Sequence, residues 1–303
     1  MMASAADSDG SPRPDCGKVS GRGAGYWMDV RAANQAAWDR AVEQGDNPYA
    51  QAVSPEMTEA ARTGHWEVQL TDSRPVPRDW FPELSGTRVL CLGSGGGQQA
   101  PVLAAAGAAV TSVDASPRQL EVDRMVAERD GLDLDTRVGD MADLSAWPDA
   151  SFDLVFNPVS TLFVPDLAPV WRECFRVLAP GGSLMTGFMN PDEFVFDEDA
   201  LDDEGRFVVR HPLPYVEHDT LSEEALAQRL RERGMFHFSH SMETQLGGLL
   251  AAGFVITGFY EDRRPESDGN PIRHYLPSYY IALARKPPLG DAVRPGAVSP
   301  AGR

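Results

Sequence analysis

The stretch RVLCLGSGGGQQAPVLAAAGAAVTSVDAS, residues 88–116, decides the fold of this chain. An apolar run ends in three glycines, Gly93, Gly95 and Gly97, and an alanine-rich run follows directly. A strand that runs straight into a helix must turn sharply, and glycine tolerates the positive φ or the close backbone approach that such a turn needs. We therefore expect Gly93 to make the turn. Gly95 and Gly97 are expected to let a ligand lie against bare backbone at a helix N-terminus.

Asp114 ends the next apolar run, about twenty residues after the first glycine, where an acidic side chain can accept hydrogen bonds from ribose hydroxyls. This half of the site is therefore expected to bind a nucleoside. Gln98 occupies the sixth position of the dinucleotide fingerprint G-x-G-x-x-G, which counts against a nicotinamide dehydrogenase. No lysine follows the glycines, so a P-loop is excluded.

Outward from this stretch, strand and helix patterns alternate along the chain, which indicates a mostly parallel sheet with helices on both faces. The expected strands are 88–93, 109–115, 136–140, 152–157, 183–188, 254–260 and 279–285. The expected helices are 25–45, 55–63, 98–106, 117–130, 167–178, 222–233 and 242–252. The fold class is therefore α/β, a Rossmann-like doubly wound sheet.

The bulk composition narrows the class of partner. A formal net charge of −18 argues against nucleic acid and against an anionic membrane surface, since both need a basic face. The three cysteines, Cys16, Cys91 and Cys174, have no paired spacing that would indicate disulfides or a zinc site. No signal-peptide pattern and no apolar run of ~20 residues is present, so we expect a cytoplasmic protein.

Composition also divides the chain. The ends, 1–23 and 288–303, are rich in Gly, Ser, Pro and Asp, and they are expected to be a disordered leader and tail. Residues 24–287 are expected to form one catalytic domain, with a helical cap over 24–80. The alternation breaks in 190–240, which is acidic and aromatic. We expect this insertion after the fifth strand to lie on the substrate side, over the C-terminal edge of the sheet.

The G-x-G-x-G turn resembles motif I of class I S-adenosylmethionine-dependent methyltransferases. Further stretches resemble later parts of that family, in order and at proper spacing: VTSVDAS, VGDMADL, FDLVFNPVS, VWRECFRVLAPGGSLMTGF and HSMETQLGGLLAAGFVITGFYED. The resemblance covers roughly 25–287 and is closest to the small-molecule, type 11 branch. It implies a seven-stranded sheet with an antiparallel last strand and S-adenosyl-L-methionine as cofactor. It also implies methyl transfer to an oxygen or nitrogen of a small molecule.

The resemblance also implies which residues bind the cofactor. Asp114 stands in the ribose-binding place, Asp140 would meet the adenine amino group, and Met141 would pack beside the ring. The expected cofactor site comprises Gly93, Ser94, Gly95, Gly97, Gln98, Asp114, Ala115, Ser116, Gln119, Asp140, Met141, Asn157, Pro158 and Val159. One position departs from the family, which usually has an acidic residue two places before the first glycine, at the methionine end of the cofactor. Cys91 stands there in this chain, and we expect its thiol to pack in the core.

Methyl transfer from a sulfonium is an in-line displacement, so the enzyme mainly aligns the acceptor and excludes water. No metal ion is required, and a base helps only when the acceptor carries a proton. His240 is the favoured candidate base because it precedes the expected helix 242–252 and faces the insertion. The other histidines are His65, His211, His218, His237 and His274. Aromatic residues expected near the mouth are Tyr26, Trp27, Trp38, Phe163, Phe194, Phe196, Tyr215, Phe236 and Phe238.

Two other functions remain open on the same fold. One is an enzyme that uses the cofactor without transferring its methyl group, and the atypical Cys91 keeps this possible. The other is a protein that only senses the cofactor. The intact glycine turn, together with Asp114 and Asp140, counts against a decayed site. The acceptor itself and the oligomeric state are not predicted by these patterns.

Overall fold

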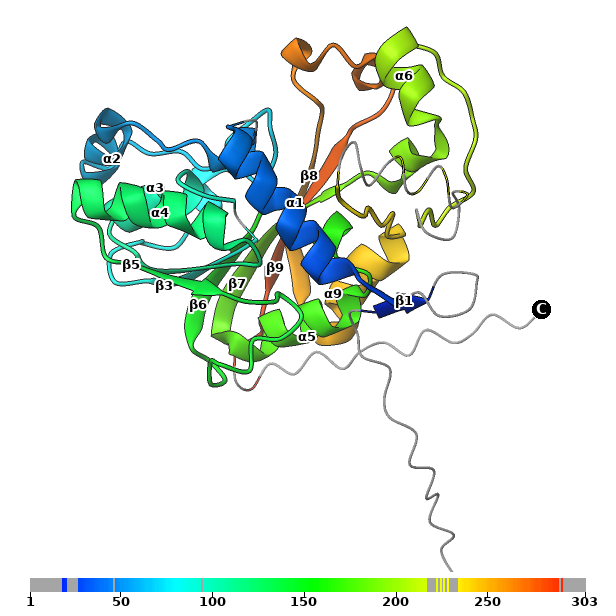
Figure 1. Ribbon diagram of the computed structural model, residues 1–303. Coiled ribbons are helices and arrows are strands. Elements are labelled where there is room, and N and C mark those ends of the chain that lie inside the picture. Colours follow the sequence, from blue (N-terminus) through cyan, green and yellow to red (C-terminus); the bar gives the residue numbers. More distant parts are fainter. Residues whose placement is uncertain are drawn as a thin grey trace, which may run out of the picture.

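A twisted seven-stranded sheet with helices on both faces forms the centre of the molecule (Figure 1). The computed structural model describes residues 18–20, 27–45, 47–93, 95–216, 222, 224, 226, 228, 234–288 and 290. The strand order is β5-β4-β3-β6-β7-β9-β8. Strand β9 runs antiparallel to both of its neighbours, while the other pairs in the sheet are parallel. The predicted Rossmann-like architecture with an antiparallel last strand is confirmed.

The order of strands and helices along the chain agrees with the alternation predicted from the sequence. The strands of the sheet are β3 (Arg88–Leu92), β4 (Ala109–Asp114), β5 (Leu134–Val138), β6 (Phe152–Asn157), β7 (Leu178–Met189), β8 (Val255–Asp262) and β9 (Tyr279–Arg285). The helices are α1 (Val30–Gln44), α2 (Pro55–Arg62), α3 (Gln99–Ala105), α4 (Pro117–Asp130), α5 (Leu167–Val177), α6 (Glu198–Glu204) and α9 (Gly248–Ala252). A π-helical turn, η5 (Glu243–Gly247), precedes α9, and the short 3₁₀ turns are η1 (Pro48–Ala50), η2 (Arg78–Trp80), η3 (Thr161–Phe163), η4 (Pro191–Val195), η6 (Glu266–Asp268) and η7 (Pro271–His274).

The N-terminal prediction needs correction. The helix expected from residue 25 begins only at Val30, because Trp27–Asp29 (β2) pairs with Lys18–Ser20 (β1) as a small antiparallel ladder. Residues 18–20, which were expected to belong to the disordered leader, therefore form a strand. The rest of that leader, most of the tail and most of the expected helix 222–233 lie outside the described residues.

Two strand boundaries also differ from the prediction. Strand β5 lies two residues earlier than expected, because Val138 pairs with Asp114 and the chain leaves the sheet at Gly139. Strand β7 begins at Leu178 instead of residue 183, because Leu178 pairs with Phe152 ahead of an irregularity in the register. Both differences arise from cross-strand pairing, which the local pattern does not encode.

The sheet separates two apolar cores. In β3, Val89 and Cys91 face the core shared with α2, α3 and α4, whereas Leu90 and Leu92 face the core shared with α5 and α9. Trp171 of α5 is the largest fully buried side chain. Because both faces are covered, only the edges and ends of the strands are free to present polar groups to a ligand.

Helix α1 crosses the molecule in front of the sheet (Figure 1) and is tied to distant segments by buried hydrogen bonds. The side chain of Asn34 donates to the carbonyl of Phe163 at 3.1 Å and accepts from the amide of Phe236 at 2.7 Å. Farther along α1, Asp39 accepts from the hydroxyl of Ser116 at 2.7 Å, next to the start of α4. The helix is therefore held as a cap over the ends of β4 and β6.

Replacing Asn34 by alanine should destabilise the fold by about 2–3 kcal/mol, because buried backbone groups at Phe163 and Phe236 would lose their partners. Urea unfolding measures the loss. Gln44→Ala, at the exposed end of the same helix, is the matched control and should change stability by less than about 0.5 kcal/mol. Equal effects of the two changes would show that Asn34 does not anchor the cap.

Candidate active site

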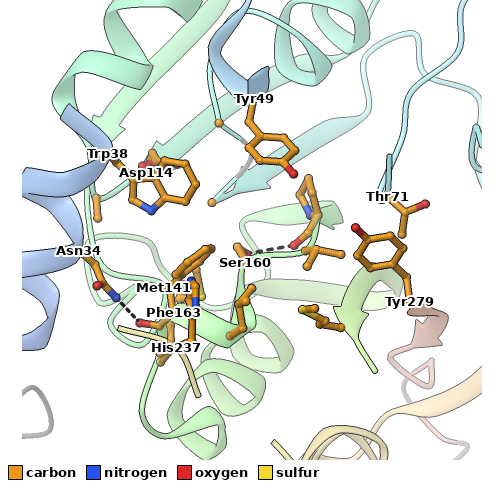
Figure 2. A pocket seen from close by; sticks show the side chains of 18 of the residues that line it. Asn34, Trp38, Tyr49, Thr71, Asp114, Met141, Ser160, Phe163, His237 and Tyr279 are labelled. Carbon is orange, nitrogen blue, oxygen red and sulfur yellow. Dashed lines mark hydrogen bonds between the residues drawn. The ribbon is translucent and has the colours of Figure 1, made fainter. Parts of the chain in front are cut away.

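A large cavity opens at the C-terminal edge of the sheet, where doubly wound folds place their ligands. Its volume is ≈ 950 Å³, at the upper end of the range for small-molecule sites. Figure 2 shows Asp114 and Trp38 towards one end, Thr71 and Tyr279 towards the other, and Tyr49 between them. The wall is built by the cap, the glycine turn, the ends of the strands and the insertion 190–240. The sequence predicted that the insertion would lie over the C-terminal edge of the sheet, and residues of the insertion do line the cavity there.

The glycine turn has the left-handed backbone that was predicted, but its bare backbone serves a different purpose. Gly93, Gly95 and Gly97 have φ values of +59°, +73° and +76°. A Cβ at Gly95 would lie 2.2 Å from the carbonyl oxygen of Tyr49, and one at Gly97 would lie 2.5 Å from Val122 Cγ1. The expectation that Gly95 and Gly97 leave room for a ligand is therefore corrected. Their missing side chains make room for the cap and for α4.

Gly93 and Gly95 still line the cavity, together with Gln98. The side chain of Gln98 donates to the carbonyl of Pro48 at 2.8 Å, which ties the start of α3 to the cap. Gly97 is absent from the described wall, and Ser94 lies outside the described residues. Of the three glycines of the turn, only Gly93 and Gly95 therefore face the cavity.

Asp114 occupies the end of β4 and faces the cavity, although its residue surface is only 7% exposed. Its Oδ1 accepts from the amide of Ser116 at 2.8 Å and from Nε2 of Gln119 at 3.1 Å. Burial raises the pKa of Asp114 to about 7 despite these hydrogen bonds. Ala115 and Gln119 line the same wall, whereas the hydroxyl of Ser116 turns away to Asp39.

The loops after β5 and β6 complete this half of the cavity. Asp140 and Met141 line it, and Asp140 Oδ2 lies 3.7 Å from Nη1 of Arg31 on α1. Pro158 and Val159 line it from the end of β6.

Asn157 lies behind the cavity wall. Its Nδ2 donates to Leu92 O at 2.6 Å and to Ser160 Oγ at 2.9 Å, while its Oδ1 accepts from Thr186 Oγ1 at 3.0 Å. Its side chain thus joins β3, β6 and β7 under the cavity floor. Asn157 was expected to belong to the cofactor site, and in the structure its side-chain amide is engaged within the protein.

The structure argues against His240 as the catalytic base. Its Nε2 donates to the carbonyl of Val164 at 2.8 Å, and the residue is absent from the described cavity wall. Burial lowers the pKa of His240 and keeps its ring neutral, and the hydrogen bond to Val164 directs Nε2 away from the cavity. Two other histidines of the sequence do line the cavity, His211 and His237. His218 lies outside the described residues.

The far end of the cavity carries a polar group of residues that the sequence reasoning missed. Tyr279 donates its hydroxyl proton to Asp72 Oδ2 at 2.8 Å. Nearby, Arg264 pairs with Glu193 at 2.9 Å and with Asp268 at 3.1 Å. Tyr279 opens an antiparallel last strand, so its place at this edge could have been inferred from the topology. Asp72 belongs to an irregular loop, whose sequence has neither the hydrophobic periodicity of a helix or strand nor a recognisable motif.

Aromatic side chains cover much of the remaining wall. Trp38 meets Phe163 edge-on with ring centroids 5.1 Å apart, and Tyr49 with centroids 6.3 Å apart. Tyr49 is among the residues that the sequence reasoning missed, and burial with the nearby Asp72 carboxylate raises its pKa to about 12. Phe194, Phe196 and Tyr215 line the wall as expected, whereas Phe236 and Phe238 pack against Val30 beneath the cap.

Comparison with known proteins agrees with this geometry. A family model described as a methyltransferase domain matches residues 90–186. The uncharacterized methyltransferase YbaJ of Bacillus subtilis is 47% identical over 248 residues, which are 82% of this chain and 95% of that protein. A ubiquinone biosynthesis O-methyltransferase of Xanthomonas euvesicatoria is 35% identical over 156 residues, which are 50% of this chain and 64% of that protein.

A solved S-adenosylmethionine-dependent methyltransferase from Mesorhizobium loti has the same fold, with a TM-score of 0.55 and 22% identity over 69% of this chain and 94% of that one. The chain therefore belongs to the S-adenosylmethionine-dependent methyltransferase family. It is a transferase, its cofactor is S-adenosyl-L-methionine, and it acts on a methyl acceptor. None of the described helices is long and apolar enough to cross a membrane. Among the described residues, no group of three or more His, Cys, Asp or Glu side chains could hold a metal ion.

Proposed function

We propose that this enzyme transfers the methyl group of S-adenosyl-L-methionine to an oxygen or nitrogen of a small molecule. The observation that carries the proposal is the cavity of ≈ 950 Å³, which joins the predicted nucleoside site to a second polar end at Asp72 and Tyr279. Such a volume has room for a cofactor with a small acceptor beside it.

The residues present fit the cofactor. The buried carboxylate of Asp114 faces the cavity where ribose hydroxyls would donate to it. Asp140 and Met141 line the adjoining wall, where the adenine amino group and ring would lie. When bound, the cofactor supplies an electrophilic methyl group. The protein orients the acceptor and, with the cap helix α1 over the cavity, excludes water from it.

The charges of the cavity wall support a neutral or cationic acceptor. Eight carboxylates line it among the described residues: Asp72, Asp114, Asp140, Asp143, Asp166, Glu193, Glu198 and Asp202. The two arginines of the described wall, Arg31 and Arg264, are both ion-paired with carboxylates. An anionic acceptor would therefore be repelled, whereas an amine or an uncharged hydroxyl compound would not. Where the acceptor carries a proton, His211 and His237 replace His240 as the candidate bases.

Incubation with methyl-tritiated cofactor tests this proposal. Purified protein is mixed with a small-molecule extract of the producing cells, and the labelled products are separated by ion exchange at pH 7. Beyond the unreacted cofactor, which is itself cationic, we expect label in new neutral or cationic products, and less of it with an Asp114→Ala variant, whose hold on the ribose is weakened. Label confined to anionic products would contradict the assigned acceptor charge. Cofactor binding without any transfer would favour one of the non-methylating functions.

A further inference from the structure

A buried carboxylate lies directly beneath the glycine turn, outside the cavity. Asp123, on helix α4, is 1% exposed, and its Oδ1 accepts the amide hydrogen of Gly97 at 2.6 Å. Gly97 is the last glycine of the turn and precedes Gln98, the N-cap of α3. This hydrogen bond therefore sets the direction in which the chain leaves the turn. A charge in such a place is costly to bury and is found where it is hydrogen-bonded.

The same carboxylate acts electrostatically on Cys91, the residue that this chain has where the resemblance to the family implies an acid. Cys91 and Ser112 are partners in the parallel pair of β3 and β4, and both are fully buried. Val126, one helical turn after Asp123, packs in the same core as Cys91. The charge of Asp123 adds to burial in raising the pKa of the Cys91 thiol. The thiol from β3 and helix α4 thus lie on the same side of the sheet, under the turn.

We propose that Asp123 is a positioning residue for cofactor binding: it holds the glycine turn through the amide of Gly97, in a chain that has Cys91 where the resemblance to the family implies an acid. Asp123 is absent from the described wall of the cavity, so it acts through Gly97 and the turn, not by touching the cofactor. The inference concerns the cofactor alone and holds whatever the acceptor is.

An acid at position 91 would add a second buried carboxylate on the side of the sheet that already carries Asp123. Two adjacent buried carboxylates repel each other, and burial already disfavours the charge of Asp123, raising its pKa to about 6. Cysteine and aspartate have similar side-chain sizes, so an acid can be introduced at position 91 with little change in packing volume there. The two positions should therefore be energetically coupled.

Four variants and one ligand test the proposal. S-adenosylhomocysteine is titrated into Asp123→Ala, Asp123→Asn, Cys91→Asp and the double variant Cys91→Asp/Asp123→Ala, and the melting temperature of each is measured without ligand. We expect Asp123→Ala to bind about tenfold more weakly, because the Gly97 amide loses its partner. Asp123→Asn retains an acceptor oxygen and should stay within about threefold of the parent. The double variant should recover most of the loss, and Cys91→Asp alone should melt lowest.

Val126→Ala is the matched structural control, because it opens the same core one turn away. It should lower the melting temperature and leave the affinity unchanged. An Asp123→Ala variant that melts lower but binds like the parent would give Asp123 a structural role only and would overturn the proposal. A double variant that is folded and binds no better than Asp123→Ala would do the same. If the double variant does not fold, Asp123→Asn and Asp123→Ala decide: a difference below about twofold overturns the proposal.

Discussion

Replacing Gly95 by alanine should abolish binding of S-adenosyl-L-methionine, whereas the same replacement at Gly86 should leave it intact. The two glycines have nearly the same backbone, with φ values of +73° and +74°. Both variants therefore incur the left-handed strain of an L-residue, about 1–2 kcal/mol. Only at Gly95 does the new Cβ meet another atom, the carbonyl oxygen of Tyr49 at 2.2 Å, while nothing lies within 4 Å of one at Gly86.

In the Gly95→Ala variant, this contact with Tyr49 should displace the cap. The clashing atom belongs to backbone, so η1 must move or the turn must open, and overpacking of this kind adds about 1–3 kcal/mol to the strain. Tyr49 lines the cavity beside Gly95, so either movement changes the cofactor site. Calorimetric titration and thermal unfolding of both variants give the comparison. Binding by Gly95→Ala within a few-fold of Gly86→Ala would show that the contact between turn and cap is not needed.

The affinity for S-adenosyl-L-methionine should rise about tenfold between pH 6 and pH 8, and Asp114→Asn should remove most of this rise. The pKa of Asp114 is raised from 3.8 to about 7. Below pH 7 its carboxyl is largely protonated and must lose a proton before it can accept both ribose hydroxyls. Binding therefore releases a proton in this range, and affinity is lost as the pH falls through 7.

At pH 8, where Asp114 is ionised, replacement by alanine should weaken binding by about 1–3 kcal/mol through the loss of charge-assisted hydrogen bonds. The effect on the unliganded fold has the opposite sense. Because the folded pKa is raised, ionisation of Asp114 opposes folding, and this penalty grows from about pH 4 to pH 7 and then levels off. Titrations across pH with parent and variants measure both effects. An affinity that is unchanged in Asp114→Ala would contradict the placement of the ribose.

The sequence predicted those parts of the fold whose signals are local. Helix α4 has its expected bounds because Ser116 caps its first turn, Pro117 opens it and Gly131 ends it in a left-handed conformation. The order of strands and helices was enough to indicate the doubly wound sheet. The same regularity predicted that the ends of the parallel strands would meet, which is why Asp114 and Asp140 lie on one cavity wall.

Other features of the site depend on contacts between segments far apart in the chain. Asp72 and Tyr279 are separated by 207 positions, and only the packing of an irregular loop against the last strand brings them together. His240 stands where the pattern predicted, yet the ring turns to Val164 instead of the cavity. Side-chain direction of this kind follows from the available hydrogen-bond partners, and a single sequence does not reveal them.

The sequence by itself therefore determined the sheet, the left-handed glycine turn and the acidic end of β4 at Asp114, because each follows from local periodicity and from residue types with special backbone or hydrogen-bonding properties. The place of Asp140 followed only from the resemblance to the family. The tertiary structure decided what each of these groups faces. It turned the bare backbone of Gly95 to the chain's own cap and placed the carboxylate of Asp123 against the amide of Gly97. Such pairings depend on how helices and loops pack across the sheet, which no local pattern specifies.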